Sequence, residues 1–159
     1  MKIRNLASNT RMHVCDIFPT VLDFAGVSRP DNYNGNELAP LYGISAMDFL
    51  TGNEVLVRNT TAEPLHFEMI ECRAIIKGKW KEMLLQPPYA DEPIWQLYDL
   101  STDPVEKYDI ASQQPEKLNE LVKEWNEYAI DVGYIKAEGE MLIKKIGPEK
   151  SYKYENLNK

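Results

Sequence analysis

The chain has 159 residues, of which 43% are hydrophobic and 27% charged, a composition typical of an ordinary globular protein with one compact domain or a small domain with appendages. Its formal net charge of -7 and its pI near 4.9 argue against nucleic-acid binding, because an acidic surface repels phosphate. No stretch approaches the roughly 18 apolar residues of a membrane span, and the N-terminus lacks the apolar core of a signal peptide, so no membrane partner is expected.

The first predicted element is a short helix over residues 17–25. Pro19 suits a first helical turn, and Gly26 is a typical end. Phe18 and Phe24 widen the apolar surface of this helix, so it needs cover on more than one side. Its other apolar positions recur at helical spacing: they are Ile17, Val21, Leu22 and Ala25.

Residues 27–44 are rich in proline, asparagine and glycine, which predicts a loop or connector. A helix of one or two turns is expected over residues 45–52, with Ser45 as its N-cap and Gly52 at its end. Residues 53–61 show no clear periodicity.

Four strands are predicted next, near residues 63–70, 72–77, 80–85 and 94–100. Gly78 is available for the turn of a hairpin, and the proline-rich residues 86–93 form a loop. Short links between successive strands favour an antiparallel sheet.

The strongest helical pattern covers residues 115–132, with Pro115 in its first turn and Gly133 at its end. One apolar face of this helix and one of the sheet would cover each other, so the predicted fold class is α+β. Residues 134–159 are expected to be a charged tail, with a short helix around residues 138–145.

The candidates for chemistry are few. Cys15 and Cys72 allow at most one disulfide, and each is best explained as a small core residue, although His13 lies near Cys15. His66 and Glu68 share a strand face and could form an acid–base pair, but a structural role is favoured. Four acidic residues near the turn after residue 98 lack the spacing of a calcium loop: they are Asp99, Asp103, Glu106 and Asp109.

Four segments, in order, resemble the C-terminal end of the sulfatase family, the arylsulfatases in particular. Residues 13–27 read HVCDIFPTVLDFAGV and are similar to the family segment H-V-x-D-I-x-P-T-x-L-D-x-A-G-V. Residues 72–81 read CRAIIKGKWK and are similar to the hairpin R-A-x-x-x-G-x-W-K. Residues 95–106 read WQLYDLSTDPVE and are similar to W-x-L-Y-D-L-x-x-D-P-x-E, and residues 109–121 continue into the last helix.

This resemblance implies a four-stranded antiparallel sheet packed by a C-terminal amphipathic helix, preceded by a helical remnant of the large sulfatase α/β domain. It implies three regions: residues 1–52 as the end of the catalytic-domain region and a connector, 53–133 as the C-terminal subdomain, and 134–159 as the tail. Sulfatases use Ca²⁺ and a formylglycine made from the cysteine of C-x-P-S-R, and neither cysteine here stands in that motif. No catalytic and no metal-binding residue is therefore assigned.

The function implied is that of a C-terminal part of an arylsulfatase-like hydrolase, inactive alone, whose partner is the large catalytic domain. Without that domain, self-association through Phe18 and Phe24 is expected. The loop of residues 86–93 would reach the rim of the substrate pocket, with Tyr89 and Asp91 as contact residues. The alternative is an independent acidic α+β interaction module without catalysis. The compartment stays open, although sulfatases are often periplasmic, secreted or lysosomal.

Overall fold

The structure is a computed structural model that describes residues 8–69, 71–87 and 89–136. The chain divides into two compact units, Met1–Leu65 and His66–Lys159, which we call unit 1 and unit 2. Among the described residues, no helix combines the length and the apolar character that crossing a membrane requires. The predicted region boundaries after residues 52 and 133 stay predictions, and residues 137–159 of the predicted tail lie outside the described part.

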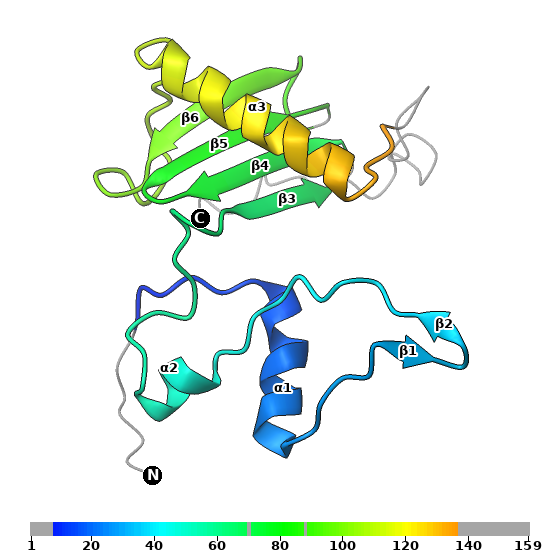
Figure 1. Cartoon of the computed structure of the whole chain (residues 1–159). Helices are drawn as coiled ribbons and strands as arrows, with labels where there is room; N and C mark the ends of the chain where they lie inside the picture. The colour runs from blue at the N-terminus through cyan, green and yellow to red at the C-terminus, as the bar shows by residue number, and fades with distance from the viewer. Residues whose placement is uncertain (1–7, 70, 88, 137–159) are drawn as a thin grey trace, which may run out of the picture. The chain divides into compact units, whose positions relative to one another are not determined.

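Unit 1 contains a turn of 3-10 helix, η1 (Val14–Asp16), that leads directly into α1 (Ile17–Ala25). The bounds of α1 are the predicted ones, and Gly26 ends the helix in a left-handed conformation with φ 65°. Figure 1 shows α1 in blue and the short helix α2 (Met47–Thr51) in cyan.

Two details of unit 1 differ from the elements that the sequence predicts. The predicted loop contains a small hairpin, β1 (Asn32–Tyr33) and β2 (Asn36–Glu37), whose turn has positive φ at Asn34 and Gly35. Asn-Gly is a strong signal for such a turn and could have revealed it. Helix α2 begins after Ala46 rather than at Ser45, whose hydroxyl accepts a bond from the amide of Met47 at 3.2 Å without being the N-cap.

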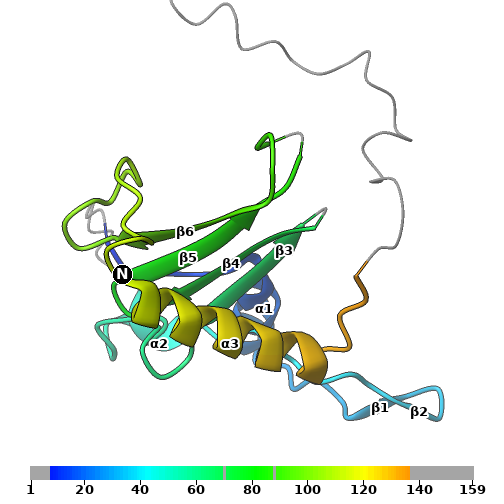
Figure 2. The same cartoon turned by 90° about the horizontal axis from the view of Figure 1, so that it is seen from above.

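Unit 2 is a four-stranded antiparallel sheet with one helix packed on it (Figures 1 and 2). The strands are β3 (Leu65–Met69), β4 (Cys72–Lys77), β5 (Trp80–Leu85) and β6 (Ile94–Asp99), and their spatial order is the order in the sequence. Helix α3 (Pro115–Asp131) lies across one face of the sheet (Figure 2). The predicted α+β fold with its antiparallel sheet and C-terminal helix is confirmed.

The core of unit 2 forms between α3 and the centre of the sheet. Leu121 and Trp125 of α3 are fully buried, as are Ile75 of β4 and Leu97 of β6. In the strand register, Glu82 of β5 lies opposite both Ile75 and Leu97. Because directly opposed residues share a face, the face that α3 covers has a glutamate at its centre.

Candidate functional site

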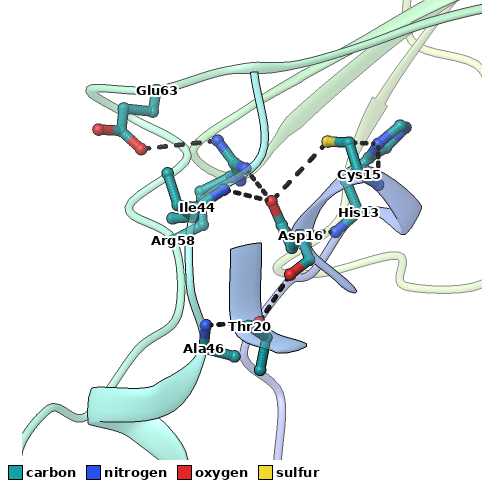
Figure 3. A network of polar contacts seen from close by, with 8 residues as sticks. All are labelled: His13, Cys15, Asp16, Thr20, Ile44, Ala46, Arg58 and Glu63. Atoms are coloured by element: carbon teal, nitrogen blue, oxygen red, sulfur yellow. Dashed lines mark hydrogen bonds and ion pairs between the residues drawn. The ribbon is translucent and has the colours of Figure 1, made fainter. Parts of the chain in front are cut away.

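A polar network surrounds Asp16, where η1 meets α1 (Figure 3). The carboxylate of Asp16 is fully buried, and its Oδ2 accepts a hydrogen bond from the amide of His13 at 2.7 Å. Its Oδ1 accepts bonds from the amide of Ile44 at 2.9 Å and from Nη2 of Arg58 at 2.5 Å. Arg58 is buried as well, and its other terminal nitrogen lies 3.5 Å from Glu63. Three donors thus compensate the burial of this one charge.

Thr20 extends the network along the first turns of α1 (Figure 3). Its hydroxyl donates to the carbonyl of Asp16 at 2.6 Å and accepts from the amide of Ala46 at 2.9 Å. Gly43 passes so close to this region that an added Cβ would lie 1.9 Å from the carbonyl oxygen of Cys15. The network therefore ties α1 to residues 43–46, and its role is structural.

The charge of Asp16 is favoured by its surroundings. Burial alone would raise the pKa of this carboxyl, but the hydrogen bonds from His13, Ile44 and Arg58 outweigh that effect and lower the pKa below its ordinary value. An ionised Asp16 paired with a buried Arg58 is the stable state.

Cys15 lies beside this network, with its Sγ 3.0 Å from Nδ1 of His13 and 3.8 Å from Oδ1 of Asp16. Burial and the negative charge of Asp16 raise the pKa of the Cys15 thiol. A nucleophilic cysteine needs a lowered pKa, so this pair does not form an activated thiolate. Cys15 and Cys72 are both free and only half-buried, so neither is the fully buried core residue that the sequence predicts. The neighbours of Cys15 are the polar side chains of His13 and Asp16.

His66 and Glu68 are not brought together as an acid–base pair. The His66 ring stacks on Tyr128 of α3, with centroids 4.1 Å apart and planes 5° apart, whereas Glu68 is exposed. Burial lowers the pKa of His66, against a smaller opposing effect of Glu124. His66 therefore packs α3 against the sheet in its neutral form.

The four acidic residues at and after the end of β6 are bonded to nearby backbone amides or paired with two lysines. Oδ1 of Asp109 accepts bonds from the amides of Leu97 and Ala111, at 3.0 Å and 2.9 Å. Asp103 accepts from the amide of Tyr108 at 2.8 Å. Asp99 and Glu106 form ion pairs with Lys79 and Lys81, each at 2.6 Å. Within the described residues no group of three or more histidine, cysteine, aspartate or glutamate side chains is placed to hold a metal ion.

The loop of residues 86–93 connects β5 to β6 at one end of the sheet (Figure 2). The amides of Tyr89 and Ala90 both bond to the carbonyl of Gln86, which makes a tight turn. Tyr89 and Asp91 are both exposed, so the two residues proposed for the pocket rim are on one accessible loop. Their role at a pocket stays a prediction.

No protein-family model matches the chain. It is 28% identical over 151 residues to an uncharacterised sulfatase of Schizosaccharomyces pombe, covering 94% of this chain and 27% of the relative. It is 32% identical over 117 residues to arylsulfatase K of Xenopus laevis, with 72% and 22% covered. It is 26% identical over 161 residues to an ulvan-active sulfatase of Formosa agariphila, with 85% and 31% covered. The chain thus spans about a quarter of the length of these relatives.

Solved structures agree at the level of the fold. A protein from a study of the metabolism of multiple glycosaminoglycans by Bacteroides thetaiotaomicron aligns with a TM-score of 0.52 and 24% identity, covering 71% of this chain and 24% of that one. A protein solved with its substrate D-glucosamine-2-N,6-O-disulfate aligns with a TM-score of 0.50 and 24% identity, covering 72% and 23%. The curated matches fall in the C-terminal part of the relatives. The chain is therefore sulfatase-like: its sequence and its fold are similar to those of the C-terminal part of that family's members.

Proposed function

We propose that this chain is the C-terminal part of an arylsulfatase-like sulfuric ester hydrolase, in which it completes the fold of a large catalytic domain. The observation that carries this proposal is the match to the C-terminal quarter or so of sulfatases over most of the chain. The deciding experiment is an intact-mass measurement of the native gene product. We expect a product several times larger than 18.3 kDa that bears C-x-P-S-R upstream. A native product of 18.3 kDa would instead favour the independent interaction module.

The apolar surface of α1 supports a large partner domain. Phe18 is 50% exposed and Phe24 is 79% exposed, and Ile17 and Val21 beside them are more than half exposed. Fully burying one such side chain stabilises a protein by about 1.5–3 kcal/mol, so this surface favours a partner strongly. The catalytic domain covers it in the proposed enzyme, and a second copy covers it when the chain is alone.

This second arrangement is testable by light scattering on the chain at micromolar concentration. We expect dimers or larger species, and we expect Phe24→Ser to shift the population toward monomers. Ile130→Ser is the matched control, because Ile130 lies on α3 and has the same 79% exposure as Phe24. A monomeric wild type, or equal effects of the two variants, would contradict the role of α1.

The residues of this chain do not fit the Ca²⁺ and formylglycine of the parent family. The sequence has no C-x-P-S-R motif, and the acidic side chains at and after the end of β6 are bonded to backbone amides or paired with lysines. The chain alone should therefore leave a chromogenic aryl sulfate intact. Turnover above a heat-treated control would refute this part of the proposal.

In the proposed enzyme, the loop of residues 86–93 borders the substrate pocket. Tyr89, 54% exposed, offers a ring for stacking, and Asp91 offers a hydrogen-bond acceptor. In the full-length enzyme we expect Tyr89→Ala to raise KM for bulky aryl sulfates and to leave kcat unchanged. Tyr108→Ala is the matched control, because Tyr108 is 62% exposed in the segment that follows β6. Equal kinetics for both variants and the wild type would make the loop a connector only.

A further inference from the structure

A carboxyl group without a partner lies in the core of unit 2. Glu82 of β5 is fully buried, and neither of its carboxylate oxygens has a hydrogen-bond partner among the described residues. Its neighbours across the sheet are Ile75 and Leu97, which form the core with Leu121 and Trp125 of α3. An ionised carboxylate at this position would have lost its water without gaining a donor, which is strongly unfavourable.

The cations of β4 on the same face do not neutralise Glu82. The guanidinium of Arg73 lies 4.6 Å from the ring centre of Trp125, and its Nε is buried without a hydrogen-bond partner. The ammonium of Lys77 pairs with Glu124 of α3 at 2.7 Å. Of the described cations, Arg73 is the one that favours the charged form of Glu82, and burial outweighs its effect on the pKa.

The charges on the other neighbouring elements are also engaged elsewhere. Asp99 of β6 pairs with Lys79 at 2.6 Å, and Lys117 of α3 lies 6.0 Å from the ring centre of Trp80. His66 of β3 stacks on Tyr128 of α3. The remaining residues of β5 and β6 on this face are uncharged: they are Trp80, Leu84, Trp95 and Leu97.

We propose that the protonation state of Glu82 controls the packing of α3 on the sheet. The neutral carboxyl group allows the helix to pack over the sheet, and loss of its proton weakens this packing. This proposal depends only on the core of unit 2, so it applies whether or not the chain is part of a sulfatase.

The direction of the pH dependence follows from the two states of Glu82. Burial raises the pKa of Glu82 to about 8, against an ordinary value of 4.5 that applies in the unfolded chain. The folded state therefore binds this proton more tightly. The contribution of Glu82 to stability is fully present below pH 4.5, decreases as the pH rises, and is lost above about pH 8. Within that window, each pH unit lowers the folding constant by at most about tenfold.

His66 acts in the opposite direction. Burial lowers its pKa below the ordinary 6.5, so the unfolded chain binds this proton more tightly and stability rises as the pH passes that region. The effect of Glu82 is therefore measured as the difference in stability between the wild type and Glu82→Gln at each pH. The effect of His66 cancels in this difference, because both chains contain His66.

The experiment uses the full chain at a series of pH values from about 5 to about 9. Hydrogen exchange of α3, corrected for the intrinsic pH dependence of exchange, reports its attachment to the sheet. We expect protection of α3 to fall with rising pH in the wild type and in the control Glu127→Gln, whose substituted side chain is exposed. Glu82→Gln, which cannot ionise, should remove this fall. If Glu82→Gln does not fold, Glu82→Met, which cannot ionise either, should likewise remove the fall in protection of α3.

An infrared spectrum at about pH 6 gives a readout that a merely structural role would not produce. The wild type should show the carbonyl band of a neutral carboxylic acid, and Glu82→Gln should lack it. Absence of this band from the wild type would overturn the proposal. So would α3 protection that follows the same pH profile in the wild type and in Glu82→Gln, even with the band present.

Discussion

Within the part of the chain that the structure describes, two carboxyl groups are fully buried, one in each unit, and they are stabilised in opposite ways. Asp16 in unit 1 accepts hydrogen bonds from two amides and from Arg58, and its pKa is lowered. Glu82 in unit 2 lies among apolar side chains and has no hydrogen-bond donor from the described residues, and burial raises its pKa to about 8. Equal burial thus leads to an ionised acid in one unit and a neutral acid in the other, because the number of donors decides the charge state.

The two sites should respond differently to mutation. Around Asp16 the charge is part of the architecture, since each donor also fixes a segment of chain. Around Glu82 the neutral carboxyl group takes the place of an apolar side chain.

Arg58→Ala should have the largest effect, because it leaves Asp16 buried without its main counter-charge. We expect a loss of about 3–5 kcal/mol in the free energy of unfolding of unit 1. Hydrogen exchange of α1 measures this loss separately from unit 2. If Lys123→Ala, at a surface ion pair on α3, costs as much, then the buried pair does not have the importance proposed here.

Amide substitutions should change the stability of the two units in opposite directions. Asp16→Asn removes hydrogen bonds to a charged acceptor and should cost unit 1 about 1.5–3 kcal/mol at neutral pH. Glu82→Gln removes an ionisable group and should stabilise unit 2 above pH 8. Hydrogen exchange of α1 and of α3 in the two variants provides the comparison. A change of the same sign in both would remove the contrast between the sites.

Acid should weaken unit 1 through Asp16. The folded pKa of Asp16 lies below its ordinary 3.8, so its contribution is present above pH 3.8 and is lost as the pH falls through the folded pKa. We expect protection of α1 to fall in this range in the wild type and to fall less in Asp16→Asn. Over the same range Glu82 stays neutral and adds no loss in unit 2. A wild type and an Asp16→Asn chain with parallel acid profiles would exclude Asp16 as the cause.

Thr20→Val should have the smallest effect, since the valine keeps the shape and removes one hydroxyl. The lost hydrogen bonds to the Asp16 carbonyl and the Ala46 amide should cost about 1 kcal/mol in unit 1. Thr51→Val is the control, because its exposed hydroxyl bonds only to carbonyls of its own helix. Denaturant unfolding followed at α1 distinguishes the two. Equal losses would mean that the Thr20 bridge adds nothing beyond a surface hydroxyl.

Local sequence was enough to predict most elements of the fold. Residues 17–25, 72–77 and 80–85 were predicted with the bounds that α1, β4 and β5 have in the structure. Apolar periodicity and a glycine at the end or in the turn are local signals, so no distant residue is needed to recognise them. The β1–β2 hairpin was missed although its Asn-Gly turn is also a local signal.

The buried carboxyl groups belong to the tertiary structure. Asp16 looks like an ordinary acid at a helix start, and its partners Ile44 and Arg58 are 28 and 42 residues away. The strand pattern of β5 permits Glu82 on either face, and only the packing of α3 decides that this face is the buried one. The elements, their order and the family resemblance could therefore be predicted without the structure, because these depend on short-range patterns. Which acid is charged and which is neutral depends on donors and apolar surfaces that only folding brings together.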